Sequence, residues 1–323
     1  MAGRQLKGLF QAYRQGDELA FRRAAQEIID EEEAKQHLAL ARDLRQLLAA
    51  PDAISVGPTV ALPEPPTDRD GSWSLAELRH AEKHLEDLVL ARTSADRLQG
   101  LAREVSAWSR LDAAGVPRRQ RILFYGPPGT GKTTAAEGLA AELGWPFLVV
   151  RLDAIVSSYL GETASNLRRV VEFAQQGSWV VLFDEFDALG RARDDRDDHG
   201  EMHRVVTAFL QLFDRFRGTS LLIAATNHEG LLDPALWRRF DEVVTFPLPT
   251  VTQLRQVLKT RLSIGGYRGL DVDGAGSALR GLPQAAAEKV AWDARRSAIL
   301  DGRERVSGED LAAAVASATD RPW

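Results

Sequence analysis

The sequence predicts an α/β fold built on a parallel sheet, with a helical bundle before it and a small helical domain after it. Between residues 121 and 246, short continuous apolar runs alternate with stretches of helical periodicity. Such alternation is typical of a parallel sheet that helices cover on both faces. The first apolar run leads into a loop of glycine and proline that opens a helix. Outside this region, apolar residues recur only at helical spacing.

Changes in composition divide the 323 residues into four segments. Residues 1–50 carry three apolar stripes at helical spacing, which predict a bundle that serves either as a packing cap or as a partner-docking module. Residues 51–73 are rich in proline and lack a periodic apolar face, so we expect an extended tether. Residues 74–248 form the α/β domain. Residues 249–323 begin at the end of a Pro-Leu-Pro break and are expected to be helical.

Each element of the α/β domain and of the C-terminal segment has its own signal. We expect Leu75 to Leu90 and Thr93 to Ala107 to be helices from their apolar spacing. Apolar runs rich in valine, isoleucine and phenylalanine predict the strands 121–125, 147–152, 179–184, 221–226 and 243–246. Helical patterns fall at 132–143, 165–175, 251–262, 285–300 and 308–318. Ser307 and Asp310 form a plausible capping box at the last of these helices.

The loop after the first strand matches G-x-x-x-x-G-K-[ST] from Gly126 to Thr133, in the strand–loop–helix context that this phosphate-binding pattern requires. Glycines there allow backbone N–H groups to converge on a polyphosphate beside a helix N-terminus, where negative charge is favoured. Lysine supplies charge to the β- and γ-phosphates. The residues expected to bind the nucleoside triphosphate are Gly126, Pro127, Pro128, Gly129, Thr130, Gly131, Lys132, Thr133, Thr134 and Asp184.

Polar side chains follow two further strands. Asp184 and Glu185 come directly after an apolar run, and Asn227 ends the next one. We expect Asp184 and the Thr133 hydroxyl to hold Mg²⁺, and Glu185 to orient or deprotonate the attacking water. Asn227 is placed to contact the γ-phosphate or the water.

An arginine pair, Arg238 and Arg239, follows Asn227 after eleven positions or so within the run Leu-Asp-Pro-Ala-Leu-Trp-Arg-Arg-Phe-Asp. Together with the phosphate loop, the Phe-Asp-Glu strand end and Ala-Thr-Asn at 225–227, this run resembles the AAA subfamily of AAA+ ATPases over residues of about 80 to 318. The spacing is most similar to the katanin and spastin group and to stand-alone bacterial relatives. The resemblance implies ATP and Mg²⁺, a homo-oligomer in the form of a ring or spiral hexamer, Asn227 as the first sensor, and Arg238 and Arg239 as arginine fingers in the neighbour's site.

The resemblance also implies a pore loop. Tyr159 and Leu160, followed by Gly161, would face a central channel and grip a protein or peptide substrate. The alternative is a tyrosine packed within its own domain, with the glycine as a turn. The resemblance further implies that residues 249–323 form a small helical lid. In this lid, Pro283 and Gln284 replace a Ser-Gly type pair that in relatives lies near the adenine, which is a departure from the family pattern.

Composition excludes several classes. The net charge of −5 gives no overall attraction to nucleic acid or anionic membrane, and the absence of cysteine rules out disulfides and Cys-based metal sites. The N-terminus lacks a signal peptide's apolar core and no run could span a membrane, so we expect a cytoplasmic protein without membrane association.

These features leave three functions to consider. The first is an ATP-driven motor that remodels or threads a protein. The second is an ATP-gated scaffold or regulator that recruits a separate effector such as a protease. The third, a DNA-acting ATPase such as a helicase loader, is disfavoured because no basic stripe with interleaved aromatic residues appears. The sequence holds no protease nucleophile constellation and no zinc-type histidine pair, so any proteolysis would need a separate chain.

Overall fold

The computed structural model describes residues 24–31, 62–157, 162–186, 209, 211–227, 237–263 and 269–323. The chain divides into two units, Met1–Pro63 and Glu64–Trp323. In the first unit, residues 24–31 form a helix in which Ile29 is buried. The rest of the expected bundle and most of the expected tether lie outside the described residues.

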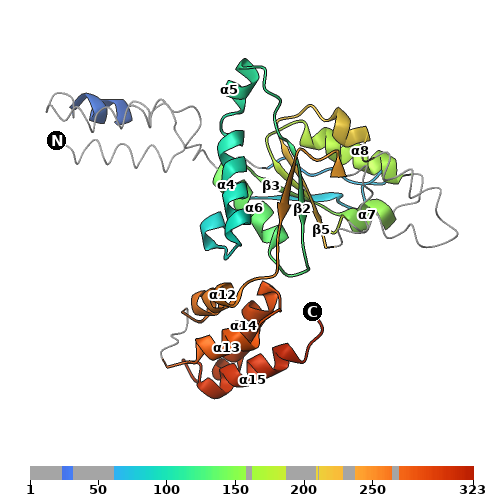
Figure 1. Ribbon diagram of the computed structural model, residues 1–323. Coiled ribbons are helices and arrows are strands. Elements are labelled where there is room, and N and C mark those ends of the chain that lie inside the picture. Colours follow the sequence, from blue (N-terminus) through green and yellow to red (C-terminus); the bar gives the residue numbers. More distant parts are fainter. Residues whose placement is uncertain are drawn as a thin grey trace. The chain divides into compact units, whose positions relative to one another are not determined.

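The α/β domain contains a sheet with the strand order β1-β3-β4-β5-β2-β6 (Figure 1). All neighbouring pairs are parallel except β1 and β3 at one edge. The strands are β1 (Ala76–Arg79), β2 (Arg121–Tyr125), β3 (Phe147–Val150), β4 (Val180–Phe183), β5 (Leu221–Thr226) and β6 (Glu242–Thr245). The predicted α/β class and parallel core are therefore confirmed.

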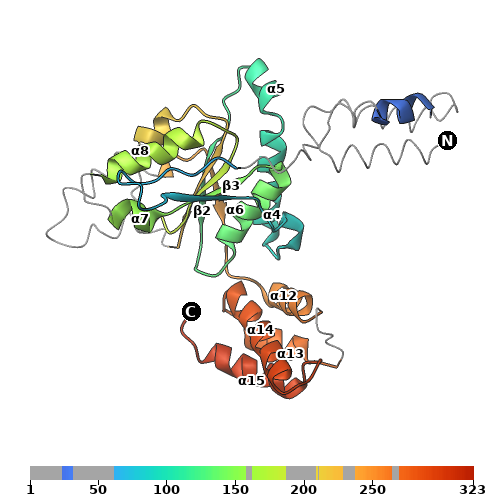
Figure 2. The same cartoon turned by 180° about the vertical axis from the view of Figure 1, so that it is seen from behind.

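Helices cover both faces of this sheet, as the two opposite views in Figures 1 and 2 show. On one face, Ile122 and Phe124 of β2 pack with buried residues of the helices α4 and α6; on the other, Leu123 packs with residues of α7 and α8. Successive residues of a strand point to opposite faces, so a strand buried on both sides reads as a continuous apolar run. The covering helices are α4 (Arg92–Val105), α5 (Trp108–Ala113), α6 (Lys132–Leu143), α7 (Leu152–Ser157) and α8 (Thr163–Ala174).

The expectation of a helix from Leu75 to Leu90 is wrong. Ala76–Arg79 forms the antiparallel edge strand β1, and only the 3-10 turn η1 (Leu85–Asp87) is helical in the rest of this stretch. Ala-Glu-Leu-Arg favours a helix by local propensity, but pairing with β3 and burial of Leu75 and Ala76 in the core outweigh that preference.

The C-terminal helices α12 (Val251–Ser263), α13 (Val272–Ala278), α14 (Gln284–Leu300) and α15 (Gly308–Thr319) enclose an apolar core of their own. The predicted capping box is present: Asp310 N–H donates to Ser307 Oγ at 3.2 Å, and Ser307 N–H donates to the Asp310 carboxylate at 2.8 Å. Helix α13 was not predicted, because two glycines lower its propensity; Asp271 caps it by accepting from Gly274 N–H. No helix in the described part of the chain is long and apolar enough to cross a membrane.

Candidate functional site

Three neighbouring strands bring the predicted site residues to one edge of the sheet. Strands β4, β5 and β2 are adjacent and parallel, and they lead into Asp184, Asn227 and Gly126, respectively. These ends open onto a cavity of about 350 Å³. Its lining includes predicted residues from all three strand ends: Pro128, Gly129, Gly131, Lys132, Thr133, Thr134, Asp184, Glu185 and Asn227.

The phosphate loop is held tightly against β6 and around its own lysine. Gly126 has φ +152°, and a side chain there would collide with the Phe246 carbonyl, so only glycine fits. Lys132, at the start of α6, is 6% exposed, and its Nζ donates to the carbonyls of Gly126 at 2.7 Å and Pro127 at 2.9 Å. An ammonium group held at the centre of the loop is positioned to meet a polyphosphate.

A pair of oxygen donors lies beside this loop. The Thr133 hydroxyl donates to Asp184 Oδ2 at 2.5 Å, joining the first turn of α6 to the end of β4. The part of the chain that the structure describes holds no cluster of three or more His, Cys, Asp or Glu suited to a metal. Two hard oxygen ligands nevertheless fit Mg²⁺, which takes one or two protein oxygens and completes its shell with water and substrate phosphates.

Glu185 sits in an unusual backbone conformation at the cavity. Its φ is +51°, in the left-handed region, and it is the only non-glycine residue with positive φ among the described residues. Its N–H donates to Asp184 Oδ1 at 2.9 Å, and the next N–H, of buried Phe186, donates to the Ala225 carbonyl at 2.8 Å. This turn fixes the chain against β5 and leaves the Glu185 side chain exposed at the cavity.

Behind the loop, α6 is anchored to the β1 edge through Glu137. Arg79 Nη1 donates to Glu137 Oε1 at 2.6 Å, and Glu82 N–H donates to the same oxygen at 3.2 Å. Burial opposes ionisation of Glu137, but these hydrogen bonds and the positive charge of Arg79 outweigh it and lower the pKa of this carboxyl. The carboxylate therefore remains charged and ties the helix that carries Lys132 to β1.

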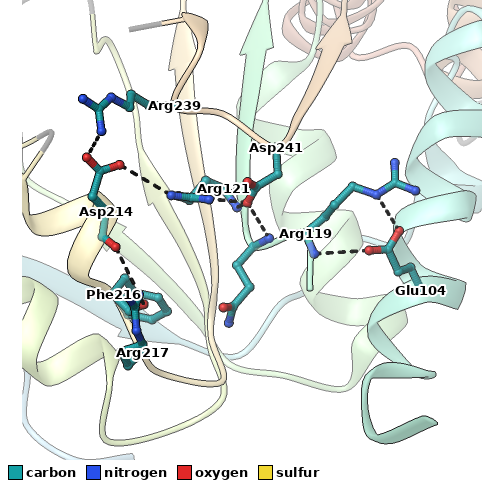
Figure 3. A network of polar contacts seen from close by, with 9 residues as sticks. Glu104, Arg119, Arg121, Asp214, Phe216, Arg217, Arg239 and Asp241 are labelled. Atoms are coloured by element: carbon teal, nitrogen blue, oxygen red, sulfur yellow. Dashed lines mark hydrogen bonds and ion pairs between the residues drawn. The ribbon is translucent and has the colours of Figure 1, made fainter. Parts of the chain in front are cut away.

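The arginine pair lies away from this cavity, at the opposite end of β2. Asp241 binds Arg121, the first residue of β2, by accepting from Nη2 at 2.6 Å and from Nε at 3.0 Å. Asp214 accepts a hydrogen bond from Arg239 Nη1 and lies 3.6 Å from Arg121 Nη1, so that it stands between two guanidinium groups (Figure 3). Arg238 is exposed and pairs with no carboxylate within the described segments.

Two predicted residues, Tyr159 and Leu160, lie outside the described residues. The structure adds residues that sequence reasoning missed. The cavity continues between residues 87–90, at the end of η1 and just after it, and the C-terminal helices α12 and α14, through Val257, Thr260, Arg261, Gln284, Ala285 and Glu288. Of these, only Gln284 carried a signal, as a departure from a family pattern. No local pattern predicted the contact between Asp214 and Arg121, because it joins residues far apart in the sequence.

Comparison with known proteins shows which family this chain is similar to. Residues 122–248 match the family model for the "ATPase family associated with various cellular activities (AAA)". The chain is 39% identical over 317 residues to the "Uncharacterized AAA family ATPase y4kL" of Sinorhizobium fredii, covering 96% of this chain and 93% of that protein.

Other relatives are longer than the matched region. The proteasome-activating nucleotidase of Pyrococcus horikoshii is 34% identical over 212 residues, which cover 64% of this chain and 53% of that protein. The ATP-dependent zinc metalloprotease FtsH 3 of Sphaerobacter thermophilus is 31% identical over 282 residues, which cover 84% of this chain and 57% of that protein. The chain thus spans little more than half of these two relatives, while it matches y4kL almost from end to end. With the phosphate loop, the acidic strand end and the lid in place, this chain belongs to the AAA family of ATPases and is an ATP hydrolase.

Proposed function

We propose that this chain is the subunit of a homo-oligomeric, Mg²⁺-dependent ATPase, a ring or spiral hexamer, that remodels or threads protein substrates. In this proposal each ATP site is shared: one copy supplies the cavity and a neighbouring copy supplies Arg238 and Arg239. The names of the relatives, a proteasome-activating nucleotidase and an ATP-dependent protease, support handling of protein substrates.

The observation that carries the shared site is the position of the arginine pair. Residues 237–241 lead into β6, which runs parallel to β2 with Glu242 opposite Ile122. The pair therefore lies near the first residues of β2, while the phosphate loop follows the last. Four residue steps along a strand span roughly 13 Å, and the γ-phosphate lies beyond that end. Arginines at this position are unsuited to their own subunit's phosphates and available to another's.

In this proposal each residue of the site has its own role. Lys132 contacts the β- and γ-phosphates, Glu185 orients or deprotonates the attacking water, and Asn227 contacts the γ-phosphate or that water. Mg²⁺ held by Thr133 and Asp184 would neutralise charge on the phosphates. The neighbour's guanidinium groups stabilise charge on the transferring phosphoryl group, which couples hydrolysis to assembly.

A complementation experiment tests the shared site. One variant carries Glu185→Gln, and the other carries Arg238→Ala with Arg239→Ala. Each should be nearly inactive alone, but a mixture should regain activity wherever a subunit with an intact Glu185 lies beside one with intact arginines. Random equal mixing places such pairs at about a quarter of the interfaces. A mixture no more active than its components, or a fully active double-arginine variant, would contradict the shared site.

The proposal that this chain remodels or threads protein substrates needs a separate test. The ATPase rate is measured with and without an unfolded protein such as casein, for the wild type and for Tyr159→Ala and Tyr159→Phe. Threading predicts that casein raises the wild-type rate, that alanine removes the stimulation and that phenylalanine retains it. If casein has no effect while ATP still drives assembly, the ATP-gated scaffold or regulator becomes the better description.

A further inference from the structure

The nucleotide cavity has two chemically different ends. One end holds Lys132, Thr133 and Asp184, which suit the phosphates. The other is formed by the segment 87–90 and the lid helices α12 and α14. Because the phosphate loop fixes one end of the nucleotide, the base must lie toward the second end, where Leu88, Val89, Leu90, Val257 and Ala285 offer apolar contact.

Gln284 is the polar side chain that connects this second end to the rest of the site. It is the first residue of α14 and is half-buried. Its Nε2 donates to the backbone carbonyl of Val89, and its Oε1 faces the phosphate loop, 3.3 Å from the point where a Cβ on Gly131 would stand. The carboxamide therefore lies between the segment 87–90 and the phosphate loop.

Two further contacts hold the Gln284 backbone in place. The next residue, Ala285, donates its N–H to the Gly129 carbonyl at 3.1 Å. A Cβ on Gly129 would stand 2.9 Å from the Cβ of Ala285 and 3.2 Å from that of Pro283, so α14 begins directly against the phosphate loop. The Val89 side chain packs against the lid core, while Leu88 and Leu90 pack against the α/β core. Both partners of the Gln284–Val89 hydrogen bond are thus fixed by packing.

The Val89 carbonyl also fixes which way the carboxamide faces. A carbonyl can only accept, so the amide nitrogen must point to Val89, and a flipped carboxamide would place two acceptors against each other. One N–H of the amide is used by the Val89 carbonyl. The second N–H, a donor, and Oε1, an acceptor, therefore lie in a fixed order along the free edge of the carboxamide. Adenine presents an amino donor beside a ring-nitrogen acceptor, whereas hypoxanthine and guanine present a C6 carbonyl acceptor beside an N–H donor. A carboxamide with a fixed order can pair with only one of these arrangements.

We propose that Gln284 is a specificity-determining residue of the nucleotide site, whose carboxamide, oriented by the Val89 carbonyl, pairs with the edge of adenine and disfavours purines with a C6 carbonyl. Because this chain is an ATP hydrolase, we infer that the fixed order of donor and acceptor is the one that matches adenine. The inference concerns binding by a single subunit, so it is independent of the shared arginines and of protein threading.

The test compares ADP with inosine diphosphate, which differ at the C6 substituent and the N1 proton, by isothermal titration calorimetry on the full chain. Diphosphates avoid hydrolysis. The wild type should bind ADP more tightly than inosine diphosphate by on the order of tenfold to a hundredfold. Gln284→Met, similar in length but without the amide, should weaken ADP by about tenfold and leave inosine diphosphate within about twofold. Gln175→Met, the same change at an exposed position on the C-terminal side of α8, should alter neither.

Gln284→Glu provides a second variant. Its negative charge should weaken both nucleotides, but its loss of the N–H donor should lower the ADP preference specifically. Equal losses for ADP and inosine diphosphate in Gln284→Met, or an unchanged preference in both variants, would overturn the proposal and leave Gln284 with a purely structural role. Tighter binding of both nucleotides to Gln284→Met would overturn it as well, since the side chain would then obstruct the base. Melting temperatures of the variants exclude a folding defect as the cause.

Discussion

Asp214 stands between Arg239, which donates a hydrogen bond to it, and Arg121, whose Nη1 lies 3.6 Å away (Figure 3). Arg238, the adjacent residue, pairs with no carboxylate in the described part of the chain. The two arginines are therefore in different situations in the same subunit. Both side chains are exposed, but within the described residues only the Arg239 guanidinium is paired with an acid, which also lies near Arg121.

This difference predicts unequal effects of substitution. Arg238→Ala should lower kcat by on the order of a thousandfold, as expected for loss of a guanidinium that stabilises phosphoryl transfer. Arg239→Ala should have a smaller effect on kcat, with a loss of stability of at most about 1 kcal/mol for its exposed ion pair. Steady-state ATPase kinetics and thermal melts of the two variants measure this. Equal loss of kcat in both would contradict the division of roles.

A second substitution tests whether the ion pair with Asp214 holds Arg239 in place. Asp214→Asn removes the negative charge that holds Arg239, so combining it with Arg238→Ala should release Arg239 to substitute in part for the missing group. The double variant is then expected to hydrolyse ATP faster than Arg238→Ala alone, measured at the same subunit concentration. If the double variant is no faster, Asp214 does not restrain Arg239 in the assembly.

The contact between Thr133 and Asp184 predicts how Mg²⁺ dependence changes. Thr133→Val keeps the shape of the side chain and removes the oxygen that would bind Mg²⁺, so the Mg²⁺ concentration for half-maximal ATPase should rise about tenfold or more. Thr133→Ser retains the oxygen and should stay near the wild type. A Mg²⁺ titration of the ATPase rate separates these results, and an unchanged requirement in the valine variant would remove Thr133 from the metal site.

The positive φ of Glu185 predicts how two inactive variants at this position differ in stability. Glu185→Ala and Glu185→Gly both remove the carboxylate, and both should abolish hydrolysis while ATP binding persists. Only glycine adopts φ +51° without steric strain, so the glycine variant should be the more stable of the two by about 1 kcal/mol. Chemical denaturation of both variants tests this. An alanine variant at least as stable as the glycine one would mean that the turn relaxes.

The sequence was most informative where function and local pattern coincide. The phosphate loop, the acidic end of β4 and the Ser307–Asp310 capping box are contiguous patterns, and the structure brings the loop and the acids to one cavity. The parallel core could be predicted because strands buried on both faces have continuous apolar runs.

What the sequence missed depends on contacts between distant residues. Strand β1 has the local propensity of a helix and exists because it pairs with β3. The Gln284–Val89 hydrogen bond joins residues 195 positions apart, and Arg121 meets Asp241 across 120. No local pattern predicts such pairs, so these contacts became visible only in three dimensions.

The contact between Glu137 and Arg79, which ties α6 to β1, predicts a pH dependence of stability. Glu137 has a lowered pKa because hydrogen bonds from Arg79 and the Glu82 backbone, with the charge of Arg79, outweigh the opposing effect of burial. A carboxyl with a lowered pKa in the folded state stabilises fully above its unfolded pKa of about 4.3 and loses that contribution as the pH falls through the folded value. Between about pH 5 and pH 3, the denaturation midpoint of the wild type should therefore fall more steeply than that of Glu137→Gln.

Glu77→Gln alters an exposed partner of the same Arg79, 3.7 Å from its Nε, and should keep the wild-type slope. Parallel slopes for the wild type and Glu137→Gln would show that this carboxylate does not couple folding to pH, and that α6 is held to β1 by packing alone.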